Sequence, residues 1–174
     1  MDSFDFWRFS LWLYRQDGVA PACLHLQEGH GVDVNILLFS LWLGHCGKTA
    51  DAATLAALST EASDWHVAVV LPLRAVRRHL KTVDQPDIPE ASTSYRDRIK
   101  ADEIHAEQIE QRLLFAAAQR RFGPGLCVAD GGDGHADAAL ANALAYLDLL
   151  GAHPSAEEAA LIAQLAGRVP PAGA

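Results

Sequence analysis

The stretch LQEGHGVDVNILLFSLWLG, residues 26–44, decides the fold of this chain. Gly29 ends the segment before it, and Asp33 occupies a position typical of a helix N-cap, because its carboxylate can accept from the free amides of a first turn. An almost unbroken apolar run follows and stops at Gly44. We therefore predict a helix that begins at Asp33 and ends near His45.

Outward from this stretch, apolar residues recur at spacings of three and four, which indicates further helices rather than strands. The predicted segments are 3–16, 21–29, 50–58, 63–83, 94–121, 136–150 and 155–167. Pro72 lies inside one of them and should kink or split it, because proline lacks the amide hydrogen that a helix uses. Two stretches rich in proline or glycine, 84–93 and 122–135, are predicted loops.

The expected fold is all-α. It is a single-domain bundle of seven to eight helices over residues 1–168, with one long helix near 94–121 and a frayed tail at 169–174. The word FSLWL occurs at 9–13 and again at 39–43. Its surroundings differ, so we interpret it as two helices filling one core and not as a duplication.

Composition excludes several classes of protein. The chain has 174 residues, of which 50% are hydrophobic and 21% charged, and a net charge of -8 with a pI near 5.4. An acidic chain of this kind is not expected to bind nucleic acid in general, since phosphate binding needs clustered positive charge. The longest apolar run is also too short to cross a bilayer, so no membrane span is expected.

The cysteines are three, at 23, 46 and 127, and no two of them form a Cys-x-x-Cys pair. We predict that all three are reduced. Asp2 and Asp5 lie where a signal peptide would carry positive charge. A cytoplasmic location is therefore expected.

The first polar candidates surround the helix start. Asp33 is most simply a cap, with Asn35 a polar residue in the first turn. The alternative is that Asn35, together with Gln27, faces inward and holds a ligand above a polar floor. The sequence leaves both readings open.

A basic stripe follows in LPLRAVRRHLK, residues 71–81. Arg74, Arg78 and Lys81 share one helical face, and Arg77 lies beside them. The stripe is either a solvated face paired with acidic neighbours or a site for an anion, because the arginine fork binds oxyanions in bidentate fashion.

An acidic stripe runs along residues 100–114, where Glu103, Glu107 and Glu110 recur at spacings of four and three. It could face the arginine stripe within the bundle, which would make both stripes structural. The spacing also raises the possibility of a carboxylate metal site, but such bundles use a Glu-x-x-His step and none occurs here. Asp102 and His105 alone have that separation.

Other motifs are missing from the sequence. The acidic, glycine-rich stretch 129–135 lacks the ligand order of a calcium loop, and no phosphate-binding loop or nucleophile elbow is present. Histidines are available for a metal, but none forms a recognised ligand pattern. We therefore predict no cofactor and no metal ligands, and we identify no catalytic residue.

Four motifs carry a resemblance to a known family: FWRFSLWLY at 6–14, GVAPACLHLQ at 18–27, GVDVNILLFSLWL at 31–43 and VLPLRAVRRHLK at 70–81. The chain resembles short proteobacterial proteins that are grouped only as a conserved family, a domain of unknown function. The resemblance covers roughly residues 6–114 and implies a small bacterial cytosolic protein. It brings no activity or cofactor. It places these residues in family motifs: Gln27, Asp33, Asn35, Trp42, Trp65, Arg74 and Arg78. At position 28 the family leads us to expect Asp, and this chain has Glu28.

Three functions are compatible with these patterns. The first is a non-catalytic module for protein interaction or regulation, possible as a homodimer and suggested by amphipathic helices and tryptophans. The second is a site for a small anionic ligand, enzymatic or not, for which the stripes and their neighbours supply the candidates. These are Gln27, Asp33, Asn35, Trp42, Trp65, Arg74, Arg77, Arg78, Glu103 and Glu107. The third is a metal-binding bundle.

Overall fold

The protein is all-α throughout the part of the chain that the computed structural model describes, residues 5–82, 88–127 and 135–170. This confirms the predicted fold class. Within those ranges there is no strand, and no helix combines the length and apolar character needed to cross a membrane. The elements are α1 (Asp5–Tyr14), α2 (Val19–His30), α3 (Val34–His45), α4 (Ala52–Trp65), the π-helical turn η1 (His66–Val70), α5 (Leu71–Thr82), α6 (Pro89–Phe122), α7 (His135–Leu149) and α8 (Ala156–Gly167).

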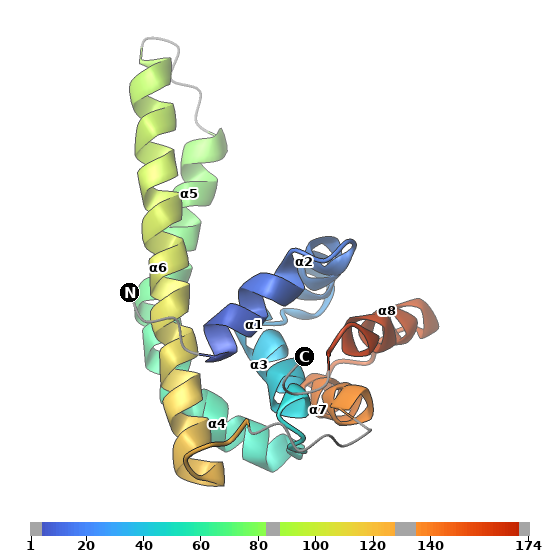
Figure 1. Cartoon of the computed structure of the whole chain (residues 1–174). Coiled ribbons are helices and arrows are strands. Elements are labelled where there is room, and N and C mark those ends of the chain that lie inside the picture. The colour runs from blue at the N-terminus through green and yellow to red at the C-terminus, as the bar shows by residue number, and fades with distance from the viewer. Residues whose placement is uncertain (1–4, 83–87, 128–134, 171–174) are drawn as a thin grey trace.

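The helices form a body from which a hairpin projects. In Figure 1, α5 and the upper half of α6 run side by side away from the remaining helices, and contacts between α5 and α6 confirm that they pair. Helix α3 lies centrally, between α1 and α2 on one side and α7 on the other (Figure 1).

The core is built around α3. Every residue from Leu37 to Gly44 is buried, so this helix has no solvent face. The two FSLWL stretches, at 9–13 and 39–43, differ in how far they are buried. In α3 all five side chains are buried, whereas in α1 Leu11 and Trp12 are exposed. The interpretation of two helices filling one core therefore agrees with the packing.

Helix α3 approaches α7 at Gly44. A Cβ added at Gly44 would lie 2.3 Å from both the Cα and the backbone nitrogen of Ala139. Carbon atoms normally stay about 3.5–4.0 Å apart, so only glycine allows the two helix backbones to come this close. The glycine that we expected to be a helix stop therefore also sets the spacing between α3 and α7.

The prediction of separate helices at 50–58 and 63–83 is wrong. Helix α4 continues without interruption to Trp65 and passes through η1 into α5. No proline or glycine occurs in α4 to stop it. The irregularity that we expected from Pro72 appears just before it, where the Leu71 amide donates to the His66 carbonyl across a π-turn.

The long helix begins earlier than predicted. Helix α6 starts at Pro89 and not near residue 94, so the expected loop 84–93 is wrong for residues 89–93. Proline is favoured at the first position of a helix, where its missing amide hydrogen would find no partner, so the signal was present in the sequence. Residues 84–87 of that loop, residue 83 of the predicted helix before it, and residues 128–134 of the second predicted loop lie outside the described ranges.

Two of the three cysteines are joined, which corrects the expectation of three reduced thiols. Cys46, at the end of α3, forms a disulfide with Cys127, and Cys23 is free and fully buried. Burial raises the pKa of the Cys23 thiol to about 12. Nothing in the spacing of Cys46 and Cys127 indicated that the fold brings them together. The expectation of a cytoplasmic location therefore loses the support that three reduced cysteines would have given it.

The first part of the expected frayed tail packs on the body. Val169 is buried, and the His45 ring donates through Nδ1 to the Pro170 carbonyl oxygen at 2.8 Å. Residues 171–174 lie outside the described ranges.

Candidate functional site

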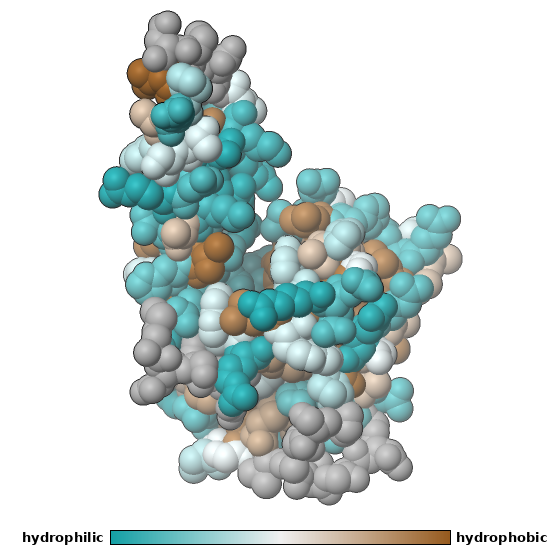
Figure 2. Space-filling model, turned by 45° about the horizontal axis from the view of Figure 1, so that its top comes forward, coloured by the Kyte–Doolittle hydropathy of each residue, from teal (hydrophilic) through white to brown (hydrophobic). Residues whose placement is uncertain are grey.

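A cavity of about 530 Å³ lies where the projecting hairpin meets the body, and five helices (α1, α2, α3, α5 and α6) contribute side chains to it. Figure 2 shows the surface hollowed between the two parts of the molecule. A volume of this size is typical of sites for small molecules.

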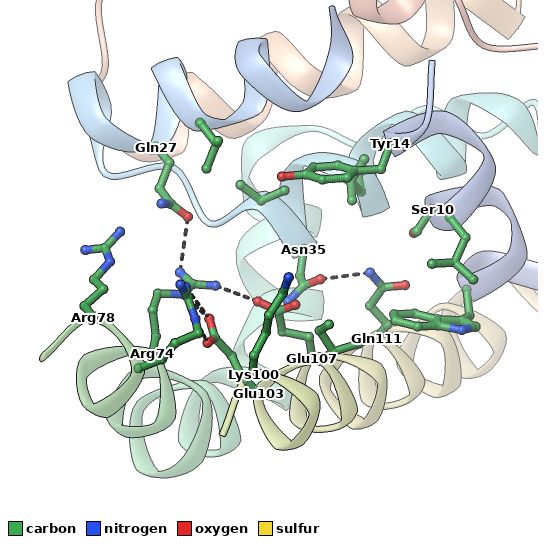
Figure 3. A pocket seen from close by; sticks show the side chains of 17 residues that line it. Ser10, Tyr14, Gln27, Asn35, Arg74, Arg78, Lys100, Glu103, Glu107 and Gln111 are labelled. Atoms are coloured by element: carbon green, nitrogen blue, oxygen red, sulfur yellow. Dashed lines mark hydrogen bonds and ion pairs between the residues drawn. The ribbon is translucent and has the colours of Figure 1, made fainter. Parts of the chain in front are cut away.

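Seven of the ten residues that the sequence analysis selected line this cavity, although they come from four different helices. They are Gln27, Asn35, Arg74, Arg77, Arg78, Glu103 and Glu107. Figure 3 shows most of them converging from α2, α3, α5 and α6. The structure therefore brings these side chains together, while Asp33, Trp42 and Trp65 lie elsewhere.

The two charged stripes pair across α5 and α6. Arg74 donates to Glu107 at 2.8 Å, to Glu103 at 3.2 Å and to the side-chain oxygen of Gln27 at 3.2 Å. Arg77 binds both carboxylate oxygens of Glu103. Burial acts to raise the pKa of Glu103, but the bonds from Arg77 and Arg74 outweigh it and lower that pKa. The expected facing of the two stripes is thus present for these four residues.

Two further cations at the cavity are not used in this way. Arg78 and Lys100 line it and are exposed, and neither has an ion-pair partner among the described residues. Four cationic side chains and only two carboxylates line the cavity, so its charge is net positive. The sequence analysis missed Lys100, although it precedes Glu103 by three residues and therefore lies on the same helical face.

The floor of the cavity is a chain of side-chain amides. Asn35 donates to Glu110 at 2.8 Å, and Gln111 donates to the Asn35 carbonyl oxygen at 2.8 Å. Because the Glu110 carboxylate accepts, it fixes the orientation of Asn35 and then of Gln111. Two oxygens beside these amides, Gln111 Oε1 and the Ser10 hydroxyl, are buried. Neither has a hydrogen-bond partner in the described part of the protein. The walls also carry apolar side chains, among them Trp7, Leu11 and Leu38.

Asp33 has two roles, which resolves the question that its position raised. One carboxylate oxygen accepts from the Asn35 amide at 2.9 Å, as the predicted N-cap requires. The other lies 2.9 Å from His66 Nδ1. The backbone amide of Asp33 donates to the Tyr146 hydroxyl at 2.9 Å, which anchors this helix start to α7.

Behind the cavity floor, Asp33, His66 and Glu110 form a compact cluster. His66 Nδ1 is 2.9 Å from Asp33 Oδ2 and also 2.9 Å from Glu110 Oε1. Side-chain exposure is 18% for His66, 11% for Asp33 and 1% for Glu110. Hydrogen bonds to the two carboxylates raise the pKa of His66 to about 10, whereas burial raises that of Glu110 to about 7. Sequence reasoning did not find this set, because Glu110 was assigned to the stripe facing the arginines and nothing pairs His66 with it locally.

The π-turn η1 puts His66 and the arginines on one face. An α-helix turns by about 100° per residue, so His66 and Arg74, eight positions apart, would differ by about 80° on a regular helix. The π-turn absorbs one extra residue and reduces the difference to about 20°. His66 can therefore meet Glu110 while Arg74 meets Glu107 on the same neighbouring helix.

The two tryptophans that were proposed as ligand contacts have structural positions. Trp42 is 1% exposed and packs between Phe6, Phe39 and Phe115, with ring centroids 5.3–5.9 Å apart. Trp65 donates through its indole nitrogen to the Ala106 carbonyl oxygen at 2.9 Å and so ties α4 to α6. Neither lines the cavity.

Comparison with known proteins extends this picture in one respect. Neither the curated proteins nor the solved structures gave a match. Residues 5–114 match the family described as "Protein of unknown function (DUF2390)", a range that contains every cavity-lining residue and the Asp33, His66 and Glu110 cluster. The remaining segment supplies α7, α8 and Cys127. Since the match covers well over half of the chain, this protein belongs to the DUF2390 family.

Proposed function

We propose that this protein binds a small organic anion with an apolar body in the cavity between α5–α6 and the body of the fold. The observation that carries the proposal is the pair of cations, Arg78 and Lys100, that line the cavity without an ion-pair partner among the described residues. Arg74 and Arg77 are held by Glu103 and Glu107 and serve to shape the wall. A carboxylate or phosphate would complete the charge that the wall leaves uncompensated.

The other side chains of the cavity fit the apolar body of such a ligand and its polar groups. Apolar side chains from α1, α2 and α3 offer contact to a hydrocarbon or aromatic body. Ser10 and Gln111 each hold a buried oxygen with no partner in the described ranges, and an unpaired buried polar group costs about 1–3 kcal/mol. A hydroxyl or amine on the ligand could satisfy Gln111 Oε1. We propose binding as the function, because both carboxylates that line the cavity, Glu103 and Glu107, are already engaged by Arg74 and Arg77.

The test compares carboxylates with their neutral amides. Octanoate and phenylacetate are titrated against octanamide and phenylacetamide, and the melting temperature of the full chain is measured. A bound ligand stabilises the folded state in proportion to the logarithm of its concentration over Kd. We expect the acids to raise the melting temperature and the amides to have little effect. An equal response to acid and amide would contradict the proposal.

Variants then locate the site. Arg78→Ala with Lys100→Ala removes the two cations and breaks no ion pair, so the fold should be retained. Affinity for octanoate should fall about 10- to 100-fold, the value of one or two charge-assisted hydrogen bonds. The matched control is Lys81→Ala with Arg98→Ala, which removes the same charge from the same two helices at positions that do not line the cavity. Equal affinity in the two double variants would refute the assignment.

An interaction module is the second candidate, and one observation favours it. Leu11, Trp12 and Leu24 are exposed by 37%, 41% and 46%, so α1 and α2 carry exposed apolar side chains, of which Leu11 and Leu24 also line the cavity. A second copy of this chain is the simplest partner for them. Sedimentation equilibrium should then show a dimer that Trp12→Ser weakens, and a monomer at all concentrations would exclude the dimer.

A further inference from the structure

We infer that Asp33, His66 and Glu110 form a binding site for a first-row divalent cation. The ligand atoms Asp33 Oδ2, His66 Nδ1 and Glu110 Oε1 converge, and the group lies within 4.8 Å overall. One imidazole nitrogen and two carboxylate oxygens are ligands that Mn²⁺, Fe²⁺ and Zn²⁺ accept. This inference is independent of the ligand proposed for the cavity.

The spacing of the ligand atoms agrees with coordination. Bonds from such a cation to nitrogen or oxygen are about 2.1 Å long, so neighbouring ligands of an octahedral ion lie about 3.0 Å apart. His66 Nδ1 is 2.9 Å from each carboxylate oxygen. A small movement of the side chains would place an ion between the three atoms.

A cation would use this arrangement more fully than a hydrogen bond does. Nδ1 carries at most one hydrogen, and two carboxylate oxygens at the same distance of 2.9 Å must share it. The three ligand atoms lie within 4.8 Å of one another, so one cation could contact all three. When an ion binds, Nδ1 gives its proton to solvent and offers its lone pair.

Charge and burial favour the same conclusion. Two carboxylates lie together here, and only about a tenth or less of either side chain is exposed. A single imidazolium balances only one carboxylate, and the other must then bind a proton or remain charged in this partly dry space. A divalent ion with a neutral imidazole neutralises both carboxylates.

The surroundings hold the ligands in place. Asn35 donates to Glu110 Oε2, the oxygen that does not face His66, as outer-shell partners of metal ligands commonly do. The N-cap bond holds Asp33 Oδ1 and directs Oδ2 at His66. The π-turn begins at His66, and such turns occur frequently at functional sites. Three protein ligands leave coordination positions for water or for a further ligand.

The test uses the full chain, freed of metal with a chelator and titrated with MnCl₂. Bound Mn²⁺ is counted by the loss of the free-ion signal in electron paramagnetic resonance, and calorimetry with ZnCl₂ provides a second measure. We expect one tight equivalent of Mn²⁺ per chain. If the wild-type protein binds neither ion more tightly than about 1 mM, the inference fails, whatever the variants do.

Variants assign the site. His66→Gln and Glu110→Gln should weaken Mn²⁺ binding more than about 100-fold, and Asn35→Ala, an outer-shell change, about 10- to 100-fold. The control is His25→Gln with His30→Gln, which removes two histidines that contact Glu158 outside the cluster. Circular dichroism shows whether each variant is folded, and His66→Gln decides the question if Glu110→Gln unfolds. Undiminished binding in folded His66→Gln, or loss of binding in the His25 and His30 control, would overturn the assignment.

Discussion

The substitution Gly44→Ala tests the closest helix contact in the structure. The added methyl would lie 2.3 Å from the Ala139 Cα and nitrogen and 2.6 Å from its Cβ. These are mostly backbone atoms inside α7, so no side-chain rotation can relieve the overlap, and α7 must move by more than about 1 Å to reach normal contact. The cost should lie at or above the upper end of ordinary overpacking, about 3 kcal/mol.

Thermal and urea unfolding followed by circular dichroism measure this cost. For a chain of this length about 3 kcal/mol corresponds to a fall in Tm of about 6–12 °C. Gly29→Ala is the matched control. Gly29 lies in α2, and its added methyl would find only Glu158 Oε1, at 3.6 Å. Alanine is the better helix former there, so this variant should be neutral or more stable by up to about 1 kcal/mol. If the free energy of unfolding of Gly44→Ala lies within about 0.5 kcal/mol of the wild-type value, the close approach of α3 and α7 is not as described.

Two other predictions concern what the disulfide and the ion pairs of Glu103 contribute to stability. Cys46→Ser should destabilise the oxidised protein by up to about 4.5 kcal/mol, because the Cys46–Cys127 bond closes a loop with a sequence separation of 81 residues. Urea unfolding with and without reductant checks this, and a difference below about 1 kcal/mol would mean that the bond adds little. Hydrogen bonds and charge from Arg77 and Arg74 lower the pKa of Glu103 in the folded protein despite its burial. The ionised Glu103 therefore stabilises the fold at pH values above its ordinary pKa of 4.5, and this stabilisation is lost as the pH falls below 4.5. Glu103→Gln should therefore flatten the acid limb of the stability profile, and an unchanged limb would contradict the cause given for the shift.

Local signals in the sequence were sufficient for part of the site. Asp33 was recognisable as a cap, and residues at spacings of three and four on two neighbouring helices place Arg74 and Arg77 opposite Glu103 and Glu107 once the helices pair. Lys100 was predictable on the same grounds, since it continues the face of Glu103.

What the sequence could not supply depends on contacts between distant segments. His66 meets Glu110 because a π-turn changes the phase of its helix, and hydrophobic periodicity does not reveal such a turn. Cys46 and Cys127 meet because α3 and the segment after α6 end close together, which is a property of the topology. Trp42 and Trp65 carry the residue type of a ligand contact, but whether an indole fills a core or faces a cavity is set by packing alone.

The π-turn between α4 and α5 lets this helix hold one residue more than a regular α-helix without changing the relative phase of its two ends. If one residue within 67–70 were deleted and the α-helix became regular, His66 and Arg74 would be seven positions apart and would still differ by only about 20°. His66 could then still meet Glu110 while Arg74 meets Glu107. An additional residue inserted here, without a second wide turn, would instead rotate Arg74 by about 100° relative to His66. A homologue shortened by one residue at this point is therefore expected to lack the π-turn and to keep both the cation cluster and the charged cavity wall, whereas a lengthened one could keep only one of them.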